Sequence, residues 1–249
     1  MIKAFYYMFK EFDFKKDLLP LWTIIFIAEF VINFAGLFSP LAMYGRVTLI
    51  FQILLLIGFI TTFIPCGYGM DCLKNYLTSN NEHKLPEIDI KKNFIKGFKF
   101  MFSFGLLYLA MFIIFAVLSG INSLLTKIHL SPLTFAVVTI ACLMLIIASF
   151  LFIASTCTFA KKEDIFSFLR LPSLYNIINA NVAKYFIGFV IFIVLMAFFY
   201  FIRIALIITL IQKGFILMTL YAFIMSIIST YFALIFLYLF KESVNPDLI

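Results

Sequence analysis

The stretch LLPLWTIIFIAEFVINFAGLF, residues Leu18 to Phe38, decides the fold, because it is 21 residues long and carries a single charge, Glu29, at its centre. A helix of about 20 apolar residues crosses the hydrocarbon layer of a bilayer. Five similar stretches follow, and the six predicted spans cover residues 18–38, 47–66, 100–120, 133–160, 185–211 and 214–240. The sequence therefore predicts an all-α integral membrane protein with six transmembrane helices.

The composition supports lipid as the solvent for most of this chain. Hydrophobic residues make up 65% and charged residues 12% of its 249 positions, whereas soluble domains have roughly 45–50% and 25%. We expect one polytopic membrane domain over residues 1–249. The net charge of +7 is interpreted as a set of topological signals beside the membrane, and no nucleic-acid partner is expected.

Three polar and basic segments alternate with pairs of spans. Residues 1–17, 67–99 and 161–184 combine lysines with apolar residues at helical spacing, which is typical of helices in the membrane interface. In the second segment Phe94, Ile95 and Phe98 fall opposite lysines of the same turns. We therefore predict three hairpins, each preceded by an amphipathic interfacial helix on the cytoplasmic side. Pro65, Gly67 and Gly69 are interpreted as marking the end of the second span, where a kink or a frayed last turn is expected.

Orientation follows from the distribution of positive charge. Fifteen of the 19 lysines and arginines fall in the three basic segments or after residue 240, three fall on the opposite side, and Arg203 lies inside a span. Cytoplasmic loops of membrane proteins carry such an excess. We expect a multi-pass protein of a prokaryotic inner membrane with both termini in the cytoplasm.

The segments IKAFYYMFKEFDFKKDLLPLW from residue 2, KLPEIDIKKNFIKGFKF from residue 84 and EDIFSFLRLPSLYNIINANVAKYFIGFV from residue 163 carry a family resemblance. They resemble the recurring segments of an uncharacterised prokaryotic membrane family, domain of unknown function four thousand and thirteen. A more distant similarity is to the non-catalytic membrane region of some glycerophosphodiester phosphodiesterases. The resemblance implies a six-span architecture, and it implies no catalytic residue.

Glu29 and Arg203 are the first candidate functional residues, because ionisable residues inside spans are costly and mark functional sites by default. They lie about 13 Å and 12 Å from the outer ends of their spans at 1.5 Å per residue, so a pair is geometrically possible. Two structural alternatives remain open. The pair can serve only to fix helix packing, or Arg203 can extend outward to the interface while Glu29 is protonated.

Two amides and three lysines complete the candidate sites. Asn33 lies one turn beyond Glu29, and Gln52 lies near the outer end of the next span, so both can line a polar cavity or simply join helices by hydrogen bonds. Lys92, Lys96 and Lys99 are expected to contact anionic lipid headgroups. No metal site or cofactor is expected, because His83 and His129 are predicted to lie on opposite sides of the membrane.

The sequence favours a non-enzymatic, membrane-embedded interaction or accessory component, with the anionic bilayer and a further membrane protein as partners. The alternative is a small transporter or channel with Glu29 and Arg203 in its path. A lipid-modifying enzyme ranks third, because no nucleophile motif or phosphate-binding loop appears.

The charge asymmetry makes a direct prediction about topology. A cysteine placed at Ser79 should react with a membrane-impermeant thiol reagent in inverted vesicles and stay unlabelled in intact cells. Labelling from outside in intact cells would reverse the assigned orientation.

Overall fold

The computed structural model describes residues 19–37, 48–78, 85–127, 131–210 and 215–249, and in these ranges the secondary structure is helical, without strands. The helices are α2 (Leu19–Leu37), α4 (Thr48–Thr61), α5 (Phe63–Thr78), α6 (Ile90–Lys127), α7 (Ser131–Lys162), α8 (Leu171–Asn179), α9 (Val182–Leu210), α10 (Phe215–Ser243) and the 3-10 helix η3 (Pro246–Leu248). Five stretches are long and apolar enough to cross a membrane, and the apolar helix α2 is shorter. The chain is thus an all-helical, multi-pass membrane protein.

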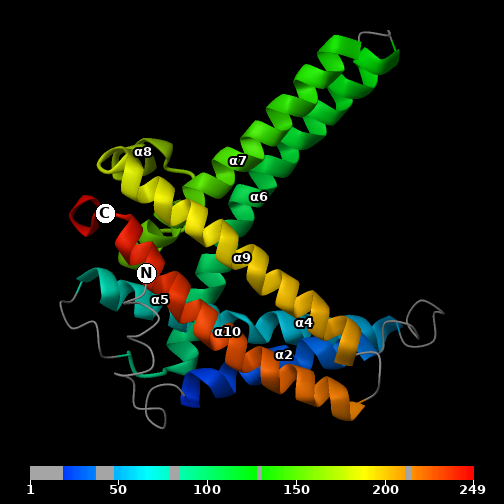
Figure 1. The fold of residues 1–249 in the computed structure, drawn as a ribbon, viewed down its shortest axis with the longest axis vertical. Coiled ribbons are helices and arrows are strands. Elements are labelled where there is room, and N and C mark those ends of the chain that lie inside the picture. The colour runs from blue at the N-terminus through cyan, green and yellow to red at the C-terminus, as the bar shows by residue number, and fades with distance from the viewer. Residues whose placement is uncertain (1–18, 38–47, 79–84, 128–130, 211–214) are drawn as a thin grey trace.

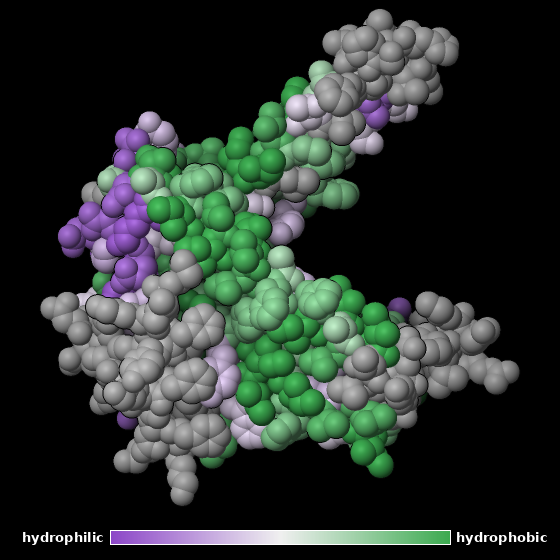
Figure 2. All heavy atoms as spheres, viewed as in Figure 1, coloured by the Kyte–Doolittle hydropathy of each residue, from purple (hydrophilic) through white to green (hydrophobic). Residues whose placement is uncertain are grey.

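The helices form two arms that diverge from a common end (Figure 1). One arm is the α6–α7 hairpin, and the other contains α2, α4, α9 and α10. Both start from the end where α5, α8 and the C-terminus lie. We call it the charged end, because Lys96 pairs there with Asp71 and Glu163, and Arg170 pairs with Asp164. The space-filling view shows a wide opening between two predominantly apolar arms (Figure 2).

The helix of the predicted second span continues further than expected and is interrupted earlier. Helix α4 gives way to α5 at Thr62, and α5 continues through Gly67 and Gly69 to Thr78. Pro65 has no N–H to donate to the carbonyl of Thr61, which breaks the regular helical hydrogen bonding one turn before it. The helix therefore does not end at Pro65, Gly67 or Gly69: its interruption lies at Thr62, and the proline and both glycines lie within α5.

The glycines have a packing role instead. A Cβ at Gly67 would collide with the backbone carbonyl of Asn93 on α6, and a Cβ at Gly97 would collide with the carbonyl of Phe63 on α5. The two helices therefore cross with their backbones in contact, which small residues permit between membrane helices.

The interfacial segments differ from the prediction in two places. The first, residues 1–17, lies outside the described residues. The second is not a separate amphipathic helix, because α6 begins at Ile90 and continues without interruption into the apolar span. In the third, residues 163–170 form turns, and the short helix α8 follows with Pro172 in its first turn.

Helix α8 packs against the protein through one face. Leu174 and Ile177 are buried against the protein, whereas Leu171 and Tyr175 are exposed. The preceding turn is anchored by Phe168, which is buried and whose ring lies 5.9 Å from that of Phe100 between centroids. The turn and α8 are therefore attached to the charged end by aromatic packing.

Replacement of Gly97 by alanine should destabilise the protein by about 1–3 kcal/mol, because the added methyl group must push two backbones apart. Gly105→Ala is the matched control in the same helix, since a Cβ there meets nothing within 4 Å and alanine favours helix. Thermal unfolding in detergent measures both. Equal melting temperatures for the two variants would contradict a backbone contact at Gly97.

Candidate functional site

Glu29 on α2 and Arg203 on α9 meet inside the protein. The Arg203 guanidinium nitrogen Nη2 lies 3.2 Å from Glu29 Oε2. Glu29 is buried, and Arg203 is partly exposed. The depth match between the two predicted spans is thus accompanied by a direct ion pair, and in this structure Arg203 does not extend away from Glu29.

Two further side chains contact the Glu29 carboxylate. Asn33 donates its amide N–H to the Glu29 carbonyl at 2.6 Å and to Oε2 at 3.2 Å. Ser229 of α10 donates to Oε1 at 3.5 Å. Helix α10 is held beside α2 by the Trp22 indole, whose Nε1–H donates to Ser226 Oγ at 2.7 Å. Three helices therefore converge on one carboxylate.

Ser229 was not among the predicted site residues. The sequence pattern that could have pointed to Ser229 is a run of small residues on α10, of which Ala222, Ser226 and Thr230 are buried. Such a face indicates close helix packing, but the sequence does not show which carboxylate the serine reaches. Tyr221, also buried on α10, lies within electrostatic range of both Arg203 and Glu29.

Gln52 does not join this group. Its side chain is exposed on α4, and it is not among the residues that line the cavity beside Glu29. Of the two alternatives given for Gln52 and Asn33, a shared polar cavity is not supported, because neither residue lines the cavity beside Glu29. The reason is rotational: the buried Gly58 of α4 faces Ile32 of α2, which turns Gln52 away from the bundle interior.

A cavity of about 460 Å³ lies beside the Glu29–Arg203 pair. Its wall is formed mainly by apolar and aromatic residues of α2, α5, α9 and α10, with Phe100 from α6 and Phe152 from α7. Glu29, Arg203 and Ser229 lie together in this wall and form its charged part. We call it the inner cavity.

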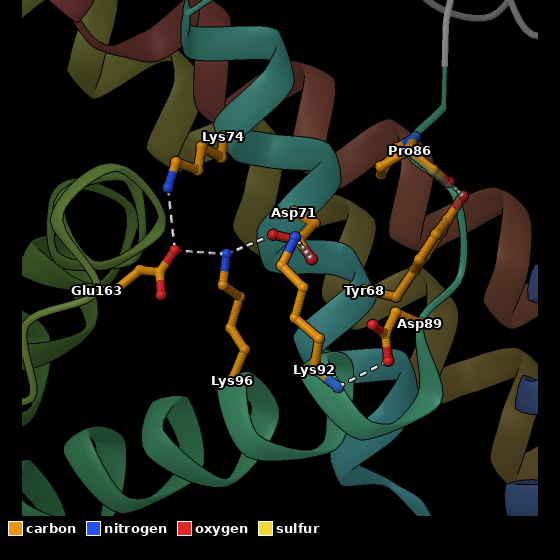
Figure 3. Close-up of polar contacts among 8 residues, drawn as sticks. All are labelled: Tyr68, Asp71, Lys74, Pro86, Asp89, Lys92, Lys96 and Glu163. Atoms are coloured by element: carbon orange, nitrogen blue, oxygen red, sulfur yellow. Dashed lines mark hydrogen bonds and ion pairs between the residues drawn. The ribbon is translucent and has the colours of Figure 1, made fainter.

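A second polar group occupies the charged end and joins three helices (Figure 3). Lys96 of α6 is buried and forms ion pairs with Asp71 of α5 and with Glu163, which follows α7, the latter at 2.8 Å. Lys74 of α5 binds the same Glu163 oxygen at 3.0 Å. Lys92 lies 3.5 Å from the other oxygen of Asp71.

This cluster corrects the prediction for Lys96. The Lys96 side chain is only 3% exposed, whereas that of Lys92 is 63% exposed. Lys96 faces inward because two carboxylates from neighbouring helices neutralise its charge there, and a buried charge requires such partners. Lys92 keeps an exposed position, and Lys99 is half-buried at the same surface.

Glu163 holds its place at the cost of backbone strain. Its φ of 54° puts it in the left-handed region, where a helix usually ends on glycine. Its N–H donates to the Phe159 carbonyl at 2.7 Å. Partial burial acts to raise the pKa of Glu163, but hydrogen bonds and charge from Lys96 and Lys74 outweigh it and lower the pKa to about 2. The carboxylate therefore stays ionised at neutral pH.

Beside this cluster is an open hollow of about 330 Å³, which we call the basic pocket. Its wall contains four lysines, one isoleucine and two carboxylates, namely Lys91, Lys92, Lys96, Lys99, Ile95, Asp89 and Glu163. The four lysines outnumber the two carboxylates of this wall, so the pocket is positively charged. Lys96 is engaged with Glu163 and Lys92 lies near Asp71, which makes Lys91 and Lys99 the main source of the excess charge. Ile95 of this wall is exposed, and so is Phe98 about one turn further along α6.

The family described as Protein of unknown function (DUF4013) matches residues 50–208. The chain belongs to this family. No curated protein and no solved structure matches the chain, so the more distant similarity to the phosphodiesterase membrane region stays a prediction. The DUF4013 match includes Asp71, Lys74, Lys96 and Glu163, together with Arg203, and it begins after Glu29.

The two sites of this DUF4013 protein differ in chemistry. The inner cavity is apolar with one self-neutralising ion pair, and the basic pocket is open and positive. Within the described ranges no three histidine, cysteine or acidic residues lie close enough together to hold a metal ion.

A double-mutant cycle tests the Glu29–Arg203 pair. Glu29→Gln or Arg203→Gln alone should cost about 3–5 kcal/mol of stability, because each leaves a charge in low dielectric without its partner. The double variant should recover much of the loss in thermal unfolding experiments. Additive losses would mean that the two side chains do not interact.

Proposed function

We propose that this protein is a non-enzymatic accessory component of a prokaryotic inner membrane that binds anionic lipid headgroups at its cytoplasmic face. The observation that carries the proposal is the basic pocket, where Lys91, Lys92 and Lys99 surround an open hollow next to exposed Ile95 and Phe98. Lysines near an anionic leaflet contribute about 1 kcal/mol each. Apolar side chains beside them suit the boundary between headgroups and acyl chains.

The proposed orientation puts the charged end in the cytoplasm. Support comes from the lysines and arginines of residues 67–99 and 161–184, whose described parts meet at this end. Helix α8 and the C-terminal residues lie at the same end (Figure 1). The exposed Leu171 and Tyr175 of α8 are suited to the interface of the same leaflet.

An accessory role is supported by the α6–α7 hairpin. Its outer part projects away from the α2, α4, α9 and α10 arm (Figure 1), and it exposes large apolar side chains such as Phe112, Ile113 and Ile147. In a membrane this surface meets lipid or the helices of another membrane protein. We propose that a partner protein is bound through this hairpin, while the basic pocket fixes the protein to the leaflet.

Replacing Lys91, Lys92 and Lys99 together by glutamine should reduce the phosphatidylglycerol retained by the purified protein, by about fivefold in affinity per lysine. Lys96 stays unchanged because it holds the ion cluster. The matched control replaces Lys162, Lys184 and Lys241, which lie outside the pocket. Native mass spectrometry with phosphatidylglycerol and phosphatidylethanolamine measures both. If both triple variants lost equal amounts of bound phosphatidylglycerol, the lipid would not bind specifically in the basic pocket.

A small transporter is the second candidate, and the inner cavity with its Glu29–Arg203 wall favours it. The Glu29→Gln/Arg203→Gln double variant separates the two functions in cells that lack the native protein. A transporter would be stable in this form but would not restore the phenotype of the deletion. An accessory component would be stable and would restore it.

A further inference from the structure

The inner cavity has the character of a lipid-binding site that is separate from the basic pocket. We propose that it binds an uncharged lipid with a hydroxyl head and a single long chain, which enters sideways from the bilayer between Phe152, Phe192 and Met196. The hydroxyl contacts the Glu29–Arg203 pair and the chain occupies the apolar part of the cavity. This inference goes beyond the proposed headgroup binding at the cytoplasmic surface.

The size and shape of the inner cavity fit a chain. Its volume of about 460 Å³ falls within the roughly 300–1,000 Å³ of small-molecule sites. Its wall on α2 reaches from Leu21 to Ile32, roughly 16 Å along the helix at 1.5 Å per residue. The cavity is thus elongated along the helices, and its wall is almost entirely apolar.

The charges in the wall specify an uncharged head. Glu29 and Arg203 neutralise each other, so an anionic or cationic ligand would bring one unpaired charge into a low-dielectric site. A hydroxyl adds no charge, and it can donate to the Glu29 carboxylate while it accepts from the guanidinium of Arg203. Ser229 supplies a further hydroxyl at the same place.

A second cavity connects this site with the space between the two arms. It has a volume of about 440 Å³, is lined by residues of α6, α7 and α9, and shares Phe152, Phe192 and Met196 with the inner cavity. These three side chains therefore form the partition between the two cavities. Because α6 and α7 belong to one arm and α9 to the other, acyl chains of the bilayer would reach this partition from between the arms.

The partition is made of side chains that can move apart. The rings of Phe152 and Phe192 are stacked with centroids 5.8 Å apart, and no ion pair crosses this partition among the described residues. Methionine is unbranched and adapts to irregular spaces. A rotamer change at Met196 or Phe192 would widen the passage between the two cavities without breaking a hydrogen-bonded helix.

Photo-crosslinking of the full-length protein in lipid nanodiscs tests the proposal. The probe is 1-hexadecanol with a diazirine in its chain, and the comparison probe is hexadecanoic acid with the same diazirine. We expect the alcohol to label peptides of α2 and α10 that face the inner cavity, at a higher yield than the acid. Ser229→Ala should weaken alcohol binding by about fivefold, the loss expected for one hydrogen bond.

Met196→Trp tests the entry route, because the larger indole ring would block the passage between the two cavities. This variant should lower the yield of labelling by about tenfold or more. Val194→Trp is its control, since Val194 is exposed on α9 and lines neither cavity. Equal labelling of the Met196 and Val194 variants, or labelling confined to exposed lipid-facing residues, would overturn the inner site. Stronger labelling by the acid would overturn the uncharged head. Each outcome is independent of the lysine variants of the basic pocket.

Discussion

The buried ammonium group of Lys96 is the interaction on which the rest of the structure depends. It lies between Asp71 of α5 and Glu163 after α7, and it is itself carried by α6. A buried charge is tolerated only where its partners are held in place, so the ion pairs fix the relative positions of three helices. Both arms of the molecule start from this junction.

Two features of the backbone make that junction possible. Gly67 and Gly97 allow α5 and α6 to approach with their backbones in contact, which brings Lys96 within reach of Asp71. The left-handed conformation of Glu163 ends α7 where the carboxylate meets both Lys96 and Lys74. A non-glycine residue in this region costs roughly 1–2 kcal/mol, and its two lysine partners offset that cost.

The junction also explains where the two proposed lipid-binding sites lie. With Lys96 engaged inside, the neighbouring lysines of α6 remain at the surface and form the basic pocket. The arms then diverge, leaving an apolar opening beside Phe152, Phe192 and Met196. Among the described residues, ion pairs are thus concentrated at the charged end and at Glu29–Arg203, and the surfaces between them are suited to lipid.

The sequence by itself determined the class of the protein, its apolar helices, its family and the candidate pair of Glu29 and Arg203. These follow from composition, from the length of apolar runs and from depth along a helix, which are local or additive properties. The sequence did not determine the inward rotation of Lys96, the outward rotation of Gln52 or the continuation of α5 beyond Pro65. Those depend on which neighbouring helix supplies a carboxylate or a glycine contact. Only the tertiary structure brings such partners together, because they lie far apart along the chain.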